Sequence, residues 1–395
     1  MRVLLLHNYY KLPGGEDVVF AAEADLLRQY GHTVHTYTVR NEAIDDMSRF
    51  RLLTSTFWNV ESYRKVRELL SSFRADVVHV HNTLPLLSPS VYLAARAEGA
   101  AVVQTIHNYR FACLNGLLRR DGMVCEQCLG KVAPWAGVTH RCYRDSRAAS
   151  LVLASSLLFH KIRGTYAKEV DAYIVLTDFA REKMVAAGLP RERLHVKPNF
   201  VDVPMRNAAS SGRHALYVGR LSTEKGVDTL LEAWRHLEGR IPLRIVGDGP
   251  LAHLVADAVR RTDSISWHSW LPRHQVLKEM SNAAFLVLPS TWYEGFPMTM
   301  VEAMAVGLPI IASNIGNLAA ILRHGVTGLL FEPGNAQDLS ETVLRILGEP
   351  GLLRALSEQA RADYQAKYTP QANYDTLIRV YERAIAIAGE RSARK

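Results

Sequence analysis

The chain has 395 residues, of which 48% are hydrophobic and 22% are charged. These are ordinary values for a globular protein, and the absence of low-complexity tracts and solenoid repeats excludes fibrous and repeat architectures. The formal net charge of +8 favours anionic partners, namely phosphorylated small molecules, anionic lipid headgroups or nucleic acid. Nucleic acid is the weakest of these, because no helix-turn-helix signature, RNP-like motif or dense Lys/Arg block occurs.

The N-terminal segment MRVLLLHNYY contains a short apolar run from Val3 to Leu6. This run is too short for the apolar region of a signal peptide, so it predicts a buried strand that starts at residue 2. No run of ~18 apolar residues occurs, and we therefore expect a cytoplasmic protein without a membrane-spanning helix.

Runs of apolar and β-branched residues alternate with helical patterns through the first half of the chain. The predicted strands are RVLLLH (2–7), HTVHTYTV (32–39), DVVHVH (76–81), AVVQTIH (101–107) and AYIVLT (172–177). Between the first two lies a helical pattern that ends at Gly31. This alternation predicts βαβ units and a parallel sheet.

The longest apolar segment, AASLVLASSLLFH, covers residues 148–160 and predicts a helix. Basic residues flank it on both sides, and these are Arg141, Arg144, Arg147, Lys161, Arg163 and Lys168. A core helix with solvated ends is the favoured interpretation. A helix that lies on the anionic inner face of a membrane is the alternative.

The alternation restarts after a polar stretch, PMRNAASSGR, which we interpret as a linker at residues 204–213. The strands predicted beyond it are HALYVG (214–219), LRIVG (243–247), AFLVLP (284–289), PIIAS (309–313) and GLLF (328–331). We therefore expect an N-terminal domain over 1–203, a C-terminal domain over 214–369, and a helix over 370–395 that packs back on the first domain. Ligands of such sheets bind beyond the carboxyl ends of the strands, which for two domains in series means the cleft between them.

The segment GRLSTEKG joins a predicted strand that ends at Val218 to a helix that starts near Val227. Arg220 and Lys225 therefore lie in a loop at the carboxyl end of a strand, near a helix N-terminus. Free N–H groups and two cations suit a diphosphate, although a turn with ordinary surface charges is the alternative. GDGP at Gly247 follows another strand, but a lone Gly-x-Gly is weak evidence of a ligand site.

The segment WYEGFPMTMVEA places Glu294 in a loop and Glu302 in the first turns of a helix that starts between Pro297 and Thr299. Carboxylates hold vicinal hydroxyls of ribose and sugars, and helix N–H groups between them hold phosphate. The alternative is a capping box, in which Thr299 and Glu302 satisfy backbone groups at the helix start.

These segments together resemble the family 4 glycosyltransferases, with Glu-x7-Glu at Glu294 and Glu302, GRLSTEKG, GDGP, and PGGED at 13–17. KPNFVD (197–202) resembles the stretch before the family's second domain. TIHN (105–108) resembles the family's Thr-x-His-Asp, with Asn108 in place of Asp. The resemblance implies an α/β GT-B fold, in which two Rossmann-like domains face each other across a cleft.

The resemblance also implies a role for individual residues. The nucleotide-sugar donor would be bound by Gly14, Gly15, Gly219, Arg220, Lys225, Gly247, Glu294, Gly295, Phe296, Pro297, Met298 and Glu302. The catalytic residues would be His107, Glu294, Arg220 and Lys225, and the residues on the acceptor side would be Glu16 and Asn108. A hydrogen-bonded structural histidine is the alternative for His107.

The implied reaction moves a sugar from a nucleotide-sugar donor, with a UDP-sugar favoured, to an alcohol of a sugar or lipid-linked sugar with retention. No Asp-x-Asp occurs in the chain, so we expect no catalytic metal, and Arg220 and Lys225 would stabilise the departing diphosphate. Synthesis of a surface polysaccharide or glycolipid would be the setting. In one departure, NIGNLAA (314–320) stands where many relatives carry Gly-Gly-x-x-Glu.

All four cysteines fall in an insert at about 111–145, and they are Cys113, Cys125, Cys128 and Cys142. The pair Cys125-x-x-Cys128 has the spacing of a zinc knuckle, and two further thiols could complete a tetrahedral structural zinc site. Four unligated thiols and a redox pair are the alternatives.

Two other functions fit the same architecture. A UDP-sugar 2-epimerase would need acid and base groups near C2 and no acceptor site. A binding protein for sugar nucleotides would need neither catalytic groups nor an acceptor site. The presence of Arg220, Lys225, Glu294 and Glu302 together argues against this alternative.

Overall fold

The computed structural model describes residues 1–11, 14–203 and 212–393, so Pro13 and most of the predicted linker lie outside the described residues. The chain divides into two compact units. One comprises Met1–Leu118, Glu126–Pro198 and Asn373–Lys395, and the other comprises Arg119–Cys125 and Asn199–Ala372. None of the helices in the described ranges is long and apolar enough to cross a bilayer.

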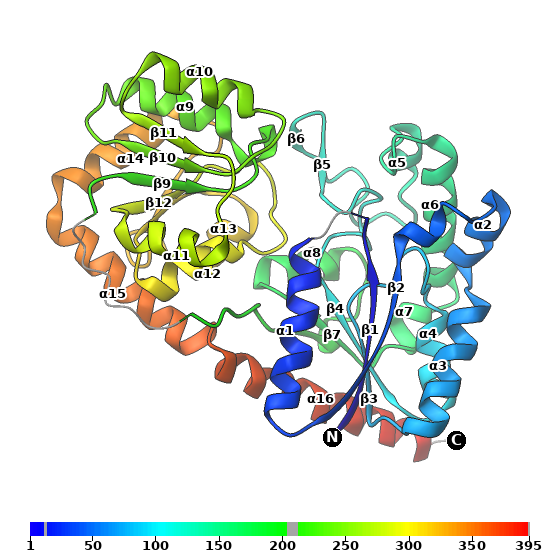
Figure 1. The fold of residues 1–395 in the computed structure, drawn as a ribbon. Helices are drawn as coiled ribbons and strands as arrows, with labels where there is room; N and C mark the ends of the chain where they lie inside the picture. Colours follow the sequence, from blue (N-terminus) through cyan, green and yellow to red (C-terminus); the bar gives the residue numbers. More distant parts are fainter. Residues whose placement is uncertain (12–13, 204–211, 394–395) are drawn as a thin grey trace. The chain divides into compact units, whose positions relative to one another are not determined.

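The described part of the first unit contains a six-stranded parallel sheet with the order β2-β1-β3-β4-β7-β8 (Figure 1). Its strands are β1 (Arg2–Tyr9), β2 (Thr33–Arg40), β3 (Val77–Val80), β4 (Ala101–Ile106), β7 (Ala172–Val175) and β8 (Leu194–Val196). β3, β4 and β7 are buried along their whole length, which explains their near-continuous apolar sequences. The strand order reverses between β1 and β3, and ligands of such sheets bind at this switch point.

Helices on both faces cover this sheet. They are α1 (Gly15–Gln29), η1 (Asn41–Ile44), α2 (Arg49–Phe57), α3 (Val60–Phe73), α4 (Ser90–Ala97), α5 (Trp135–Thr139), α6 (Arg147–Ile162), α7 (Thr165–Lys168), α8 (Asp178–Ala186), η2 (Arg191–Arg193) and α16 (Pro370–Ala393). From Asn373 onward α16 belongs to this unit, and its Leu377, Tyr381 and Ala384 share one core cluster with Phe20 and Leu27 of α1. The last helix of the chain thus completes the core of the first unit.

The cysteine-containing insert lies between β4 and α6. It includes an antiparallel hairpin of β5 (Arg119–Arg120) and β6 (Met123–Val124), which groups with the second unit. The helix predicted over 148–160 is α6, and it is buried on one side only. Leu153 and Leu157 are buried, whereas Leu151 and Ile162 are 48% and 76% exposed. The interpretation as a plain core helix is therefore right for one face of α6 and wrong for the other.

The described part of the second unit contains a parallel sheet with the order β11-β10-β9-β12-β13-β14 (Figure 1). Its strands are β9 (Ala215–Val218), β10 (Leu243–Val246), β11 (Ile265–His268), β12 (Phe285–Leu288), β13 (Ile310–Ser313) and β14 (Leu329–Phe331). The strand order is that of the Rossmann fold, with its switch point between β9 and β12. All ten predicted strands of the chain occur. The prediction missed β8 and β11, which lie at sheet edges, and the short hairpin of β5 and β6.

Two core clusters, one on each face, hold the second sheet between helices. The helices are η3 (Thr223–Lys225), α9 (Val227–His236), α10 (Ala252–Arg261), α11 (Arg273–Asn282), α12 (Met298–Val306), α13 (Gly316–Ile321), α14 (Ala336–Gly348) and α15 (Pro350–Lys367). The starts of α9 and α12 agree with the prediction.

Candidate active site

The loop from Gly219 to Gly226 leaves β9 at the switch point of the second sheet. Gly226 has a φ of +71°, and a Cβ there would lie 1.8 Å from the carbonyl oxygen of Pro289. Only glycine allows this turn to pack against the strand end of β12. The loop carries Arg220, whose side chain is exposed, and Lys225, whose side chain is 26% exposed. Both cations are therefore available to a ligand at this edge of the sheet.

The GDGP loop after β10 packs against the loop from Gly219 to Gly226. Gly247 has a φ of +146°, and a Cβ there would lie 1.8 Å from the carbonyl oxygen of Gly219. The N–H of Leu221 donates to the carbonyl of Asp248 at 2.9 Å. The glycine at 247 therefore permits close packing of the two loops.

Glu294 and Lys225 come together from the two strand ends that border the switch point. Glu294 is only 6% exposed. Its Oε1 lies 2.9 Å from the Nζ of Lys225 and also accepts a hydrogen bond from Ser290. The Lys225 ammonium lies 5.9 Å from the centroid of the Trp292 ring. The predicted carboxylate Glu294 and the predicted cation Lys225 thus form an ion pair.

The Glu294 loop is fixed by the NIGNLAA segment at residues 314–320. The side-chain amide of Asn317 donates to the backbone carbonyls of Glu294 and Gly295, the latter at 2.7 Å. Gly316 has a φ of +51°, and a Cβ there would lie 2.6 Å from Cδ1 of Tyr293. Asn317 was missed by the sequence analysis, and the unusual NIGNLAA segment was the available signal.

Glu302 has a different partner from Glu294. The capping-box alternative is wrong, because α12 starts at Met298 with Pro297 as its N-cap and no side chain caps it. The Glu302 carboxylate instead pairs with Nε of Arg273 on α11 at 2.8 Å. Arg273 is 55% exposed along its side chain, so a ligand can compete for this carboxylate. Gly295, Phe296 and Pro297 lead into the N-terminus of α12, where backbone N–H groups favour an anion.

In the first unit, the predicted glycines lie at the N-terminus of α1. A Cβ at Gly14 or Gly15 would meet no atom within 4 Å, so the packing of the chain does not require glycine at either position. Asp17 fixes this helix start, accepting the N–H of Gly14 at 2.8 Å and lying 2.7 Å from Nε2 of His7. Burial, together with the charge of Asp17 and against that of Arg110, raises the pKa of Glu16 to about 7.

His107 and Asn108 follow β4 and line one open cavity together with Arg110, Leu84 and Leu157. The Nε2 atom of His107 lies 3.1 Å from Nδ1 of His81, which follows β3. Burial, then the nearby His81, holds the pKa of His107 well below its usual range. His107 is therefore a neutral imidazole at neutral pH.

The four cysteines are not gathered into a metal site. Within the described residues, the single group of three or more potential ligands whose atoms all lie close together is Glu23, His79 and His81. Cys113 is buried, and its thiol donates to Oδ1 of Asn115 at 2.9 Å. The structural zinc stays a prediction, with no tetrahedron of Cys113, Cys125, Cys128 and Cys142 to support it.

Two family models match the chain. The model described as Glycosyltransferase Family 4 covers residues 13–204, and the model described as Glycosyl transferases group 1 covers residues 206–363.

Curated relatives agree with these matches. The alpha-D-kanosaminyltransferase of Streptomyces kanamyceticus is 27% identical over 317 residues, which are 73% of this chain and 72% of that protein. The lipopolysaccharide 1,6-galactosyltransferase of Escherichia coli (strain K12) is 27% identical over 245 residues, which are 58% of this chain and 66% of that protein. The matched part of this chain spans only 21% of an exopolysaccharide phosphotransferase of Streptomyces coelicolor. It spans 54% of the amylovoran biosynthesis glycosyltransferase AmsK of Erwinia amylovora.

Among solved structures, HepE of Anabaena in complex with UDP is similar with a TM-score of 0.69 at 15% identity, over 97% of this chain and 100% of that one. At this identity the likeness shows the fold, which is that of the GT-B glycosyltransferases, as the sequence predicted. The two family matches together span most of the chain, and it belongs to the family 4 glycosyltransferases.

Proposed function

We propose that the protein transfers a sugar from a nucleotide sugar, with a UDP-sugar favoured, to an alcohol acceptor with retention and without a divalent metal. The observation that supports this most strongly is the pairing of Lys225 with Glu294, beside Arg220, at the Rossmann switch point of the second unit. HepE of Anabaena, a protein of similar fold, has been solved with UDP and with UDP-glucose.

The chemistry follows from the charges of these side chains. A diphosphate that enters beside Lys225 competes with Glu294 for the ammonium and takes the guanidinium of Arg220 bidentately. The released carboxylate of Glu294 can then accept hydrogen bonds from hydroxyls of the donor sugar. As the bond between the sugar and the diphosphate breaks, a bond forms between the anomeric carbon and the acceptor oxygen. Negative charge grows on the leaving phosphate, and the two cations stabilise that charge. The acceptor hydroxyl transfers its proton to that phosphate.

The acceptor is a sugar or a lipid-linked sugar, and the setting is synthesis of a surface polysaccharide or glycolipid. The curated name of one relative, a lipopolysaccharide 1,6-galactosyltransferase, supports this class. In the first unit, the cavity lined by His107, Asn108 and Arg110 offers several polar groups for sugar hydroxyls.

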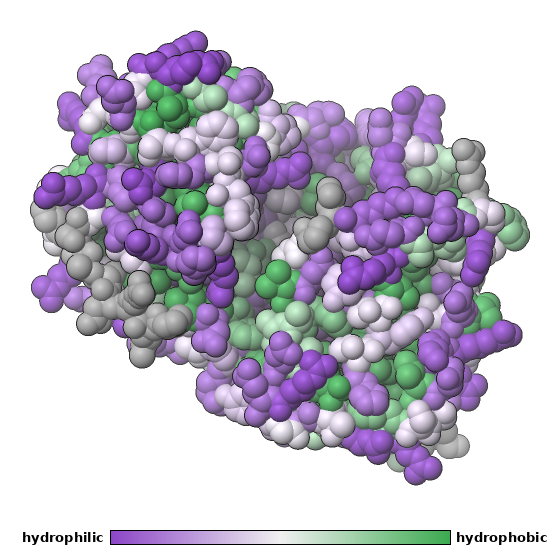
Figure 2. All heavy atoms as spheres, in the orientation of Figure 1, coloured by the Kyte–Doolittle hydropathy of each residue, from purple (hydrophilic) through white to green (hydrophobic). Residues whose placement is uncertain are grey.

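The protein further works at the cytoplasmic face of an anionic membrane. An apolar groove between α2 and α6 is lined by Leu52, Leu53, Pro85, Val152 and Leu153. Large apolar side chains on the two helices are exposed around it, namely Phe50, Leu53, Leu151, Phe159 and Ile162. Arginines at 51, 144, 147 and 163 accompany them. Figure 2 shows hydrophobic side chains at the surface among hydrophilic ones in this part of the first unit. Apolar side chains with flanking cations suit an anionic bilayer.

A panel of radiolabelled nucleotide sugars tests the enzyme activity. We expect slow hydrolysis of one UDP-sugar in the absence of acceptor, at a rate that EDTA does not change. Product anomers identified by NMR would show whether the configuration is retained. An epimerised donor without nucleotide release would show a 2-epimerase instead, and tight UDP binding with no turnover of any donor would show a binding protein.

A further inference from the structure

A buried ion pair lies beneath the acceptor-side cavity of the first unit. Glu23 of α1 and Lys197, which follows β8, are both fully buried, and the Lys197 ammonium pairs with Oε1 of Glu23. Asn373 of α16 provides a second partner for this ammonium, at 3.3 Å. Burial alone would raise the pKa of Glu23, but Lys197 and then His81 hold it well below its usual range. Glu23 is therefore a carboxylate.

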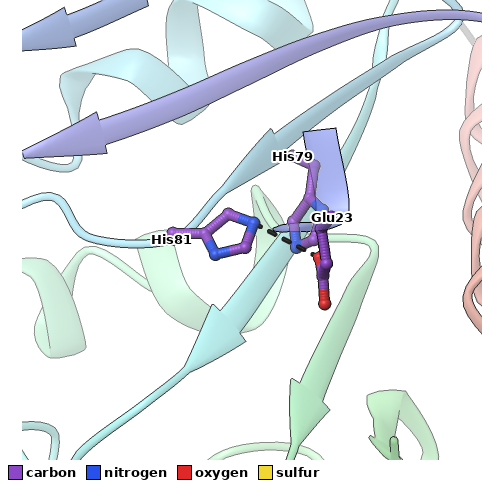
Figure 3. A group of neighbouring side chains, drawn as sticks. All are labelled: Glu23, His79 and His81. Atoms are coloured by element: carbon purple, nitrogen blue, oxygen red, sulfur yellow. Dashed lines mark ion pairs between the residues drawn. The ribbon is translucent and has the colours of Figure 1, made fainter. Parts of the chain in front are cut away.

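The second oxygen of Glu23 determines which nitrogen of His81 carries the proton. Oε2 lies 3.4 Å from Nε2 of His81 and 3.8 Å from Nδ1 of His79, as Figure 3 shows. Oε2 and the His81 nitrogen are buried, and neither completes a hydrogen bond with any described residue. Their mutual contact is attractive only if Nε2 bears the proton, because an imidazole lone pair would repel the carboxylate.

The position of the proton on His81 in turn determines which nitrogen of His107 is protonated. A neutral imidazole protonated at Nε2 has a lone pair on Nδ1, and Nδ1 of His81 lies 3.1 Å from Nε2 of His107. Against a neutral His81, His107 therefore donates from Nε2, which leaves its own lone pair on Nδ1. No hydrogen bond within the described residues engages that atom, and His107 lines the cavity with Asn108.

A metal ion between Glu23, His79 and His81 is a weaker interpretation of the same group. Nδ1 of His79 lies 2.8 Å from the hydroxyl of Tyr381, and its Nε2 lies 2.7 Å from that of Thr105. Both nitrogens of His79 are thus occupied by hydroxyls. The Lys197 ammonium on Glu23 would also repel a second cation in this low-dielectric interior.

We propose that Glu23 acts through His81 to hold His107 in the tautomer whose Nδ1 accepts a hydrogen bond from a sugar hydroxyl in the cavity. Glu23 and His81 are positioning residues, and no proton is transferred along them. The hydroxyl is that of the sugar that the proposed glycosyltransferase binds here, so the role of the relay rests on the proposed function. The relay itself rests only on the geometry of the first unit.

The tautomers can be read directly from the intact protein. In protein with 15N-labelled histidine, long-range 1H–15N spectra should show His81 and His107 both protonated at Nε2 and unprotonated at Nδ1. Assignment uses His81→Asn and His107→Gln, each of which removes one signal set. A proton on Nδ1 of His107 in the native protein overturns the relay.

Glu23→Gln provides the sharpest perturbation. Lys197 selects the amide oxygen of the glutamine, so the amide NH2 faces Nε2 of His81 and can only donate to it. Both tautomers should then reverse, and His107 should carry its proton on Nδ1. Tyr381→Phe is the matched control, since it removes one hydrogen bond from the same buried cluster but none from the relay. Reversal in the control, or none in Glu23→Gln, contradicts the proposal.

A second pair of variants keeps the test valid if Glu23→Gln does not fold. His81→Asn keeps a polar oxygen close to the position of Nδ1, whereas His81→Leu removes it. Supporting groups of this kind typically change activity by ~10- to 100-fold, so we expect such a loss in His81→Leu and recovery of most of it in His81→Asn. Equal activity of the two variants, at equal thermal stability, means that His81 only fills space.

The pH profile separates positioning from packing. In wild type, kcat/KM should show no titration of His107 across the neutral pH range, since burial and then the nearby His81 hold the pKa of His107 well below its usual range. The native tautomers in a protein that turns over no nucleotide sugar would leave the relay intact and remove the proposed function. Transfer activity that is unaffected by His81→Leu would support the proposed function and remove the role of the relay.

Discussion

At the scale of single residues, Lys225 is the cation that links the donor loop to Glu294. Its ammonium is partly exposed and pairs with a nearly buried carboxylate, so it is both accessible to phosphate and fixed in place. Arg220 lies in the same loop, and its side chain is exposed. The two cations therefore differ in how well they are preorganised.

Lys225→Ala should lower kcat/KM for nucleotide-sugar turnover by ~10²-fold or more, which is the usual effect of removing one preorganised charge from a transition state. Because the Glu294 carboxylate is nearly buried, losing its partner also lowers the midpoint of thermal unfolding, so the kinetics are measured well below the midpoint of the variant. Steady-state kinetics and thermal melts measure the two effects. Lys278→Ala, on an exposed position of α11, is the control. Kinetics equal to those of the control would remove Lys225 from the site.

Glu16 makes stability depend on pH, because burial raises its pKa from 4.5 to about 7. A raised carboxyl pKa means that the folded state holds the proton more tightly than the unfolded state. The stabilisation that the protonated Glu16 carboxyl provides is complete below about pH 4.5 and is lost as the pH rises through about 7.

Glu16→Gln should therefore gain stability relative to wild type at pH 8, by ~1–3 kcal/mol, and show little difference at pH 5. Urea unfolding at the two pH values provides the measurement. Asp25→Asn, on the exposed side of the same helix, should show no such difference. An equal change at both pH values would mean that Glu16 ionises normally.

At the scale of elements, α13 and the segment before it fix the loop that carries Glu294. Asn317 satisfies two backbone carbonyls of that loop, and the left-handed Gly316 allows Tyr293 to approach. The place where the chain departs from the pattern of its relatives is thus a structural support of the predicted donor site.

Asn317→Ala should leave two carbonyls without their partner, which typically costs ~1–3 kcal/mol, and should loosen Glu294. We expect the KM for the donor to rise more than kcat falls, because the loss affects the position of the sugar-binding loop. Asn314→Ala, at an exposed position of the same segment, is the matched control. Unchanged donor KM with lowered stability would show that Asn317 supports the fold alone.

At the scale of the whole molecule, the net charge of +8 and the exposed apolar residues of α2 and α6 favour attachment to an anionic surface. In the proposed attachment, the charge would attract the bilayer over a distance, and the apolar side chains would add burial once contact is made.

Wild-type protein should co-sediment with vesicles that contain phosphatidylglycerol, but not with vesicles of phosphatidylcholine alone. Leu151→Gln combined with Ile162→Gln should reduce binding ~10-fold, since two large apolar side chains lose their burial in the interface. Trp270→Gln, which changes a 74% exposed aromatic residue in the second unit, is the control. Equal binding by the double variant and the control would locate the contact elsewhere.

Reasoning from the sequence predicted the two parallel sheets, the positions of the loops after β9 and β12, and the start of the helix after each loop. Local patterns suffice for these features, because buried parallel strands are apolar runs and helix starts follow glycine or proline turns. They did not suffice for β8 and β11, which are short edge strands with partly exposed side chains.

Which charged side chains form pairs depends on the three-dimensional fold. Lys225 pairs with Glu294, and Glu302 pairs with Arg273 and does not cap its helix. Within the described residues, no three of the cysteines lie close enough together to share a metal ion. The proposed relay would join Glu23 of α1 with His81 and His107, which follow β3 and β4, and Lys197, which follows β8, pairs with Glu23. Such pairings depend on which strand ends are neighbours and on how deeply each charge is buried. Neither quantity is encoded in local sequence spacing.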